Sequence, residues 1–562
     1  MLLTGVQVNR PAGTKLHSRG SDRYVYQVVE SVYHKDKRYC TEKKKCIGKM
    51  VAGSDILMIP NTAFELYYPD VLDAAEILPD PPEFSDTLKA GAFIAVRRIA
   101  EMEGLSSILA GIYGKKDAES ILDIVAYIVA DQSSVFQHYP AFMRDHLQLG
   151  EHILSDVSIS RLLGKAVDDN AISEFLRRWN MQHNDLEHIY IGYDSSNFNC
   201  EAENIRLAEF GAAKDDPTRP QVNFAVTVSQ RDTTPLDYEI YPGSIVDMSE
   251  CQYMMERMQD YGYRSVGFLF DRGYYLEENI QYLDENGYEF LIMCCENTKF
   301  IRSLFLEHFD RLHDLMESYL PGLELSGISI KAEHWGKKRC FHLYYDEVHA
   351  SFSRRQFLEK ISSMSQDLEK LAGQRLRKNA NFTSYKPWFE LDIVSSGNTR
   401  YLKGYSSRSE KIREHMDLFG HFCLMASNDC EADAALEIYR GRDNIEKFFR
   451  SIKWGMDFRT PGVHTDARAN AKFHLIFLSG IIRNRMLQVS KIIKKETKNK
   501  RSFTVPGMID LLEMIECTVN SEGVYKRRYA LTAKQKLILE QLQITESDID
   551  TEILAFNKHK NH

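Results

Sequence analysis

Between about residue 87 and residue 180, apolar residues recur every three or four positions, which is the spacing of amphipathic helices. The pattern predicts four helices, over residues 90–104, 105–112, 118–132 and 172–179. We therefore expect a helical domain over residues 86–185.

The residues before this domain follow a different pattern. A β-branched, tyrosine-rich stretch at residues 24–33 predicts strand structure, and lysines cluster directly after it. A proline-rich string at residues 78–83 indicates a linker. Residues 1–85 are therefore predicted to form a separate, β-containing basic region.

After residue 186 the chain contains short apolar runs separated by helical stretches, a pattern typical of a mixed α/β fold. This part, residues 186–296, is expected to be the first half of an α/β core. The predicted strands cover residues 189–193, 223–229, 236–241, 265–270 and 288–294, and the predicted helices cover residues 249–261 and 276–286.

The α/β pattern is interrupted at residues 297–418. A long charged helix is predicted there over residues 354–378, with strands at 341–345 and 389–393. This composition indicates an insertion domain.

The α/β pattern then resumes over residues 419–490, the expected second half of the core. It contains a strand at 421–426 and a long helix at about 432–454. The remaining residues, 491–562, are predicted to be a basic C-terminal helical region.

Length and composition agree with a multidomain globular protein. A single hydrophobic core stops growing at roughly 250–300 residues, so 562 residues predict two to four domains. Hydrophobic residues make up 43% of the chain and charged residues 27%, which excludes a disordered or collagen-like protein.

The net charge of -9 has the wrong sign for a protein that coats itself in nucleic acid, but the charge is unevenly distributed. Residues 35–49 hold seven basic against two acidic residues, and residues 491–501 hold six against one. Both segments fit phosphate-binding surfaces and equally fit solvated charge runs. The candidate DNA-binding lysines are Lys43, Lys44 and Lys45.

The ten cysteines indicate neither a zinc site nor a disulfide framework, because they form no CxxC pair and have no histidine at zinc-finger spacing. The N-terminal apolar stretch is too short for an export signal, and no apolar run approaches the length of a membrane span. These features predict a cytoplasmic protein without membrane contact.

Two aspartates follow apolar strands in the predicted core. Asp194 follows the sequence YIGY, and Asp271 follows FLF and precedes a glycine-containing turn. Ligands of open α/β sheets lie beside strand ends of this kind. Each aspartate alone also fits a structural role as a turn or capping residue.

A third group of polar residues lies on the long helix predicted after residue 432. In a continuous helix Tyr439, Arg442, Glu446 and Lys453 fall within about 60° of arc, and the apolar residues of the helix lie on another face. The stripe also fits a solvated surface with a weak Arg442–Glu446 pair. Helical geometry does not choose between these two interpretations.

Asp194, Asp271 and Glu446 together offer only hard oxygen ligands. Such a set suits Mg²⁺, with Mn²⁺ as a substitute, and two such ions about 3.5–4 Å apart catalyse in-line phosphoryl displacement. Arg442 and Lys453 beside Glu446 then fit contacts to phosphate groups.

The spacing Tyr439-x2-Arg442-x3-Glu446-x6-Lys453 resembles the YREK signature of the DDE transposases of bacterial insertion sequences, the insertion-sequence family four and its relatives. The sequences FDRGY at 270–274 and YDSSNF at 193–198 resemble that family's two aspartate regions. Relatives often have serine where this chain has Leu276, so a hydroxyl contact there is not carried over. The resemblance covers roughly residues 186–490.

This resemblance implies a ribonuclease-H-like mixed-sheet core, interrupted by a β-rich insertion, with Asp194, Asp271 and Glu446 as catalytic, metal-binding triad. It implies double-stranded DNA as partner, both as transposon ends and as target, and a homodimer on DNA. The helical domain 86–185 would contribute to DNA binding. The DNA-contacting residues expected outside the basic segments are Tyr439, Arg442, Lys453, Arg272, Trp335 and Trp388.

The two tryptophans are candidates for stacking on an unpaired base, because basic residues adjoin each of them, although core or surface packing is the more common role of any one tryptophan. The leading hypothesis is a bacterial transposase that cleaves transposon ends and joins the 3′ hydroxyls to target DNA. The alternatives are a host-retained nuclease of the same fold, and a non-catalytic DNA-binding regulator on the same scaffold.

Overall fold

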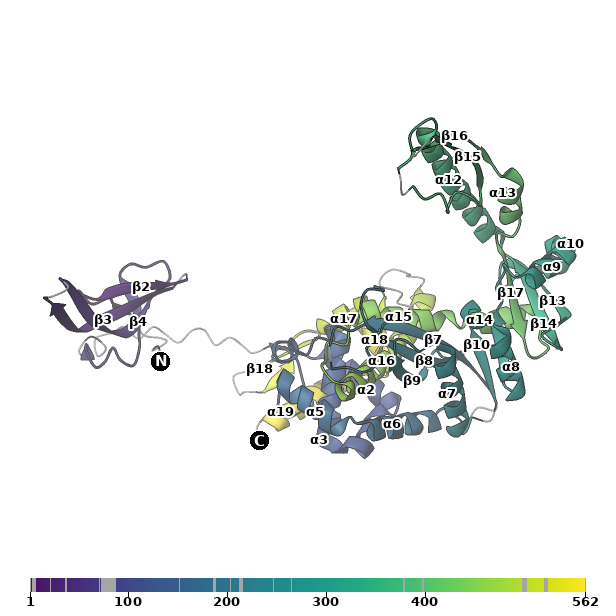
Figure 1. The fold of residues 1–562 in the computed structure, drawn as a ribbon. Helices are drawn as coiled ribbons and strands as arrows, with labels where there is room; N and C mark the ends of the chain where they lie inside the picture. The colour runs from purple at the N-terminus through teal and green to yellow at the C-terminus, as the bar shows by residue number, and fades with distance from the viewer. Residues whose placement is uncertain are drawn as a thin grey trace. The chain divides into compact units, whose positions relative to one another are not determined.

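The computed structural model divides the chain into two compact units, Met1–Asp86 and Thr87–His562 (Figure 1). Each unit is described by itself. The structure describes residues 2, 7–20, 22–35, 38–69, 71, 87–150, 152–184, 188–202, 204–211, 216–245, 247–263, 265–377, 380–396, 399–497, 503–519 and 524–560. The linker predicted at residues 78–83 lies outside them.

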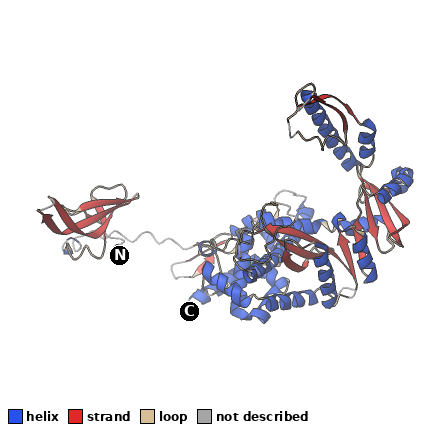
Figure 2. Cartoon of the chain, viewed as in Figure 1, coloured by secondary structure: helices blue, strands red, loops and turns tan. Residues whose placement is uncertain are grey.

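The first unit is a five-stranded antiparallel sheet with the strand order β1-β5-β4-β3-β2 (Figure 2). Its core is small, and Val25, Ile47 and Phe64 are its fully buried centre. The distal half of the β3–β4 hairpin leaves Val32 and Tyr33 exposed. The strands are β1 (Val8–Asn9), β2 (Lys15–Arg19), β3 (Asp22–His34), β4 (Tyr39–Met50) and β5 (Leu57–Pro60).

The second unit contains a helical body built around one long buried helix, α16 (Asp466–Thr497). A helix that is apolar on all sides requires neighbours on all sides. The hydrophobic core around α16 takes in helices from both ends of the unit. These helices are α2 (Gly91–Met102), α3 (Leu105–Ala130), α4 (Tyr139–Met143), α5 (Asp156–Ala166), α6 (Asp169–Met181), α17 (Val505–Glu513), α18 (Ala533–Gln541) and α19 (Glu546–Lys560).

A three-stranded sheet joins the two ends of this body. Its strand order is β19-β18-β6, so β6 (Thr87–Lys89) pairs with β18 (Glu516–Val519), which pairs with β19 (Tyr525–Arg527). The two helices predicted over residues 105–112 and 118–132 form the single element α3, which is kinked at Gly114, where φ is 76°. The N-terminal helices and the C-terminal region therefore share one core.

The central element of the second unit is a nine-stranded mixed sheet with the order β12-β13-β14-β17-β11-β10-β7-β8-β9. Strand β10 is parallel to β7 and β11, and the other pairs are antiparallel. The strands are β7 (Ile189–Asn199), β8 (Gln221–Ser229), β9 (Pro235–Pro242), β10 (Val266–Phe270), β11 (Glu289–Met293), β12 (Tyr319–Leu320), β13 (Leu325–His334), β14 (Lys337–Tyr345) and β17 (His421–Ala426).

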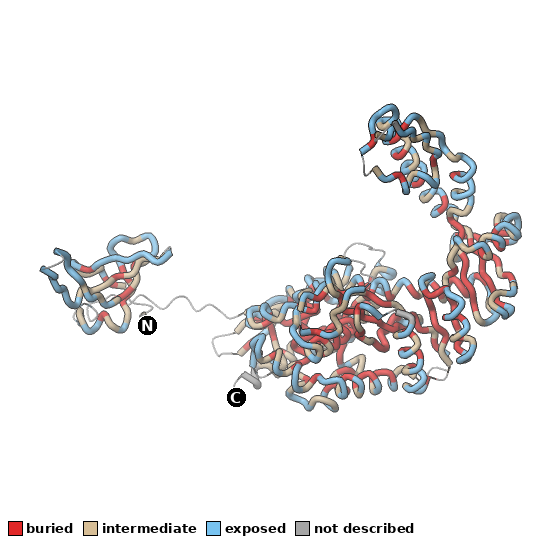
Figure 3. Tube along the Cα trace, in the orientation of Figure 1, coloured by how far each residue is buried: buried red, intermediate tan, exposed pale blue. Residues whose placement is uncertain are grey.

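Helices cover both faces of this sheet, and most of its strand residues are buried (Figure 3). One face packs against α7 (Asp247–Asp260), α8 (Glu277–Glu285) and α9 (Lys299–Glu307). The other face packs against α14 (Ala432–Arg440) and α15 (Asp443–Gly455). Two short helices, α10 (Phe309–His313) and α11 (Leu315–Ser318), lie against β13.

The segment predicted as an insertion is divided between two structures. The strand predicted at 341–345 is part of β14, which pairs with β17 in the central sheet. The rest forms a lobe with a small core of its own (Figure 1). This lobe contains α12 (Glu347–Leu371), the hairpin of β15 (Phe389–Ser396) and β16 (Thr399–Ser407), and α13 (Ser409–Met416).

Helix α12 differs from the predicted helix 354–378 at both ends. It begins at Glu347 because the Asp346 side chain caps it by accepting a hydrogen bond from the His349 amide. It ends at Leu371, two residues before Gly373, which has φ of 73°. No helix among the described residues is long and apolar enough to cross a bilayer.

Candidate active site

Asp194 lies inside a strand and does not follow its end. The predicted strand 189–193 continues in the structure to Asn199, because β7 pairs with β8 from Ile191 to Asn199. The pairing of β7 with β10 stops at Gly192, opposite Leu269. Asp194 therefore lies two residues beyond the last residue of β7 that pairs with β10. Its side chain is on the same face of the sheet as Gly192.

Asp271 directly follows β10, and the parallel register with β7 brings it level with Asp194. Its carboxylate accepts a hydrogen bond from the Arg272 amide at 2.6 Å and caps a short 3₁₀ turn, η1 (Arg272–Tyr274). The side chain remains 42% exposed. Asp271 thus has the capping role that turn chemistry predicts, and it also faces Asp194 across the strand boundary.

The helix predicted over residues 432–454 is broken into α14 and α15. At the break the Arg442 amide donates a hydrogen bond to the Tyr439 carbonyl, and the Ile445 amide donates one to the Arg442 carbonyl. Both hydrogen bonds span three residues, as in a 3₁₀ turn. The prediction of one continuous helix that carries all four polar residues was therefore wrong. Tyr439 belongs to α14, and Arg442 is the residue before α15.

Arg442 is the centre of the site. Its guanidinium lies 3.6 Å from an Asp194 oxygen, 3.2 Å from an Asp271 oxygen and 3.4 Å from a Glu446 oxygen. Only 7% of its side chain is exposed. Burial disfavours the charged form, but the neighbouring Tyr439 and the three carboxylates raise the pKa of Arg442 above its usual value. Arg442 is therefore a permanent cation held by all three acids.

Glu446 reaches this centre because α15 lies close against β7. A Cβ atom on Gly192 would come within 2.4 Å of the Ile445 Cδ1 atom. The absence of a side chain at Gly192 therefore lets α15 approach the sheet, and Ile445 is fully buried there. The glycine inside the YIGYD strand was the available signal for this contact, and the sequence reasoning missed it.

We expect Gly192→Val to displace α15 and with it the Glu446 carboxylate. A misplacement of about 1 Å is enough to lower a catalytic rate by roughly a hundredfold. The measurement is DNA cleavage together with DNA binding. Gly404→Val is the matched control, because Gly404 also lies in a strand and a Cβ there meets nothing within 4 Å. Equal cleavage rates in the two variants would show that this close approach does not position the site.

Tyr439, Lys453 and Arg272 differ in their surroundings. Tyr439 is buried, and that burial raises the pKa of its hydroxyl above the usual value. Lys453 lies two turns beyond Glu446 on α15, with its ammonium 5.0 Å from the centre of the Phe198 ring. Arg272 is largely exposed and lies 3.9 Å from a Glu296 oxygen.

The remaining predicted DNA contacts lie elsewhere. Trp335 occupies the β13–β14 turn and packs on Tyr275, which follows η1, with ring centres 4.9 Å apart. Trp388 packs against Phe357 in the lobe, also at 4.9 Å. Lys43, Lys44 and Lys45 lie on β4 of the first unit. For all of these residues, DNA contact stays a prediction.

The donor set suits a hard divalent cation, since Asp194, Asp271 and Glu446 supply carboxylate oxygens from three separate segments. With Arg442 included, these four side chains carry a formal charge of -2, which a divalent cation would neutralise. In the described part of the chain, however, no three His, Cys, Asp or Glu side chains are arranged to hold one ion. A metal would compete with Arg442 for the same oxygens.

Fold and site together define a class: a mixed-sheet α/β protein in which two aspartates from adjoining strands meet a glutamate from a later helix. The family model described as Transposase DDE domain matches residues 194–480, just over half of the chain. The match begins at Asp194 and includes Asp271 and Glu446. The chain belongs to this family of DDE transposases, which are enzymes that generally use divalent metal ions.

Two further comparisons add little to this assignment. No curated protein matches the sequence. A solved structure of a piggyBac transposase synaptic complex with hairpin DNA is similar over 83% of this chain and 82% of that chain, at 8% identity and a TM-score of 0.31. So low a TM-score gives no residue correspondence.

Proposed function

We propose that this transposase cleaves the ends of a mobile element by metal-assisted hydrolysis and then transfers the freed 3′ hydroxyls to target DNA. The observation that carries the proposal is the convergence of Asp194, Asp271 and Glu446 on one guanidinium. These residues are far apart in sequence, and a structural role needs no such convergence.

In this proposal the three carboxylates would hold two Mg²⁺ or Mn²⁺ ions, and these metals would supply activation of the attacking oxygen and stabilisation of the leaving one. Arg442 orients a phosphate group of the transposon end through its planar fork of donors. Tyr439, Lys453 and Arg272 contact the backbone on either side of that phosphate. Water is the first nucleophile and the 3′ hydroxyl the second.

A joining assay with precut transposon ends tests the function. We expect the protein to insert such ends into plasmid DNA when Mg²⁺ or Mn²⁺ is present, and to do nothing in excess chelator. Cleavage of intact ends without any joining of precut ends would identify a nuclease. Binding without either reaction would identify a regulator. The homodimer on DNA stays a prediction, which sizing of the protein with bound ends measures.

The first unit offers a second prediction about DNA binding. Side chains alternate along β4, so Lys43 and Lys45 share an exposed face, whereas Lys44 lies on the opposite face, 3.3 Å from Glu42. We expect Lys43→Ala with Lys45→Ala to weaken DNA binding about tenfold and to flatten the salt dependence by roughly two phosphate contacts.

Lys44→Ala is the matched control, since it removes the same kind of charge from the face that already carries an ion pair. Its DNA affinity should stay within about twofold of wild type. Equal losses in the double variant and the control would mean that the exposed face of β4 does not bind DNA.

A further inference from the structure

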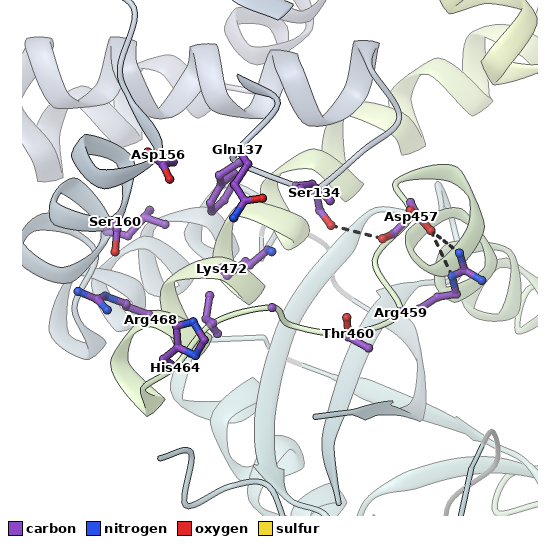
Figure 4. A pocket seen from close by; sticks show the side chains of 15 residues that line it. Ser134, Gln137, Asp156, Ser160, Asp457, Arg459, Thr460, His464, Arg468 and Lys472 are labelled. Atoms are coloured by element: carbon purple, nitrogen blue, oxygen red, sulfur yellow. Dashed lines mark hydrogen bonds and ion pairs between the residues drawn. The ribbon is translucent and has the colours of Figure 1, made fainter. Parts of the chain in front are cut away.

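A pocket of about 630 Å³ lies at the C-terminal end of α15 (Figure 4). Three parts of the second unit enclose it: the segment 134–137 after α3, the helix α5, and the chain from Asp457 to the first turns of α16. The catalytic hypothesis uses none of its lining residues. Lys472 extends from α16 into the space between these parts (Figure 4).

Lys472 is a buried cation without a counter-charge. Only 5% of the residue is exposed, and within the described part of the chain its ammonium has no hydrogen-bond or ion-pair partner. Its ammonium lies over two ring faces, 4.9 Å from the centre of Phe136 and 5.8 Å from that of Phe458. Lysines are almost never buried unless they are paired.

Two other buried cations of this unit have the counter-charge that Lys472 lacks. Arg257 pairs with Asp237 and Glu239, and Arg339 pairs with Asp284 at 2.5 Å. Burial lowers the pKa of Lys472 from its ordinary 10.5 to about 8, so the side chain is still mostly protonated at pH 7. An unpaired ammonium that faces a cavity is a site for an anion.

The rest of the lining favours a phosphate group as that anion. Arg468 adds a second cation, and hydroxyl donors come from Ser134, Ser160 and Thr460. The acids of the lining already have partners. Asp457 pairs with Arg459 at 2.8 Å, and the Asp156 carboxylate accepts a hydrogen bond from the Val157 amide at 2.8 Å.

The position of the pocket suits the DNA backbone. The first turn of α15 holds Glu446 beside the catalytic centre, and a later turn holds Lys453. The helix ends at Gly455, two residues before Asp457. At 1.5 Å per residue, Glu446 and Gly455 are about 14 Å apart along the helix. That distance corresponds to roughly four nucleotides along one strand of a duplex.

We propose that this pocket is a phosphate-binding subsite in which Lys472 receives one phosphodiester group of the DNA backbone, roughly four nucleotides from the cleaved bond. The identification of the ligand as DNA rests on the proposed transposase function. Free phosphate has the same chemistry, so the experiment separates the two sources.

The first measurement is the thermal stability of the full chain in phosphate and in chloride at equal ionic strength. Phosphate should raise the melting temperature of the wild type by about 1–2 °C and should not raise that of Lys472→Met. Lys115→Met on the exposed surface of α3 is the control and should respond as the wild type does. No effect of phosphate on the wild type would overturn the proposal.

The pH dependence of the melting temperature of Lys472→Met tests the proposal without any DNA. The folded state lowers the pKa of Lys472, so the unfolded chain binds the extra proton between about pH 8 and pH 10.5, and this group adds stability as the pH rises through that range. In chloride, Lys472→Met should therefore melt higher than wild type at pH 7, and the difference should shrink by pH 10. A variant that melts lower at pH 7 would show that Lys472 is already paired, which contradicts the proposal.

The second measurement is the affinity for transposon-end DNA as a function of salt. Lys472→Met should lose about tenfold in affinity, and the slope of log K against log salt should fall by about 0.9, the value for one phosphate. Arg468→Gln, which leaves α16 and Lys472 in place, should cause a loss in the same direction. If Lys472→Met keeps the DNA affinity of the wild type although phosphate stabilises the wild type, the pocket is a site for free phosphate. That result would overturn the assignment to DNA.

The catalytic hypothesis is checked separately in the same experiments. Glu446→Gln should lose cleavage but keep the phosphate effect and the salt slope. If the wild type cleaves DNA while Lys472→Met binds it normally, the pocket proposal fails and the proposed function stands. If the wild type responds to phosphate but neither binds nor cleaves transposon ends, the proposed function fails, and the assignment to DNA fails with it.

Discussion

Replacement of Asp194, Asp271 or Glu446 by alanine is expected to lower strand cleavage and strand transfer by at least about a thousandfold. The reason is that each substitution removes one of the three carboxylates that, among the described residues, lie within 4 Å of the Arg442 guanidinium. Loss of interactions made mainly in the transition state lowers the rate much more than binding. Affinity for transposon ends, measured in Ca²⁺ or without metal, should stay within a few-fold of wild type.

Glu277→Ala is a suitable control for the triad variants. Glu277 begins α8, six residues after Asp271, and is an exposed carboxylate outside the cluster. Its removal changes the net charge by the same amount and should leave cleavage unchanged. Strand transfer that persists in any one of the three triad variants would remove that residue from the catalytic assignment.

The second large effect is expected at Arg442. Arg442→Ala should lower cleavage by about a hundred- to a thousandfold, the range observed when a preorganised donor to a reacting oxygen is removed. Arg442→Lys keeps the charge but loses the planar fork, so it should recover only part of this loss. Single-turnover cleavage of labelled ends measures both variants.

Several parts of the fold were predictable because local patterns carry them. The strand predicted at 265–270 corresponds to β10, and the strand predicted at 421–426 is identical to β17. Short apolar runs next to turn residues identify buried strands from the local sequence alone. The order of Asp194, Asp271 and Glu446 along the chain was likewise visible, and the family match includes all three positions.

Other features depend on contacts between distant segments. Strand β14 belongs to the central sheet because β17, almost eighty residues later, supplies its partner. The N-terminal helices share a core with α17 and α18 because the middle of α16 is buried on every side and needs all of them as neighbours. The local sequence pattern does not indicate which distant strand or helix will pack against a buried face.

By itself, the sequence determined the chemistry that is available to this protein: three carboxylates, their spacing on α/β elements, and the basic and aromatic residues near them. Only the tertiary structure decided their arrangement, for two physical reasons. The parallel register of β7 and β10 brings Asp271 level with Asp194. The close packing of α15 against β7, at Gly192 and Ile445, brings Arg442 and Glu446 to the two aspartates.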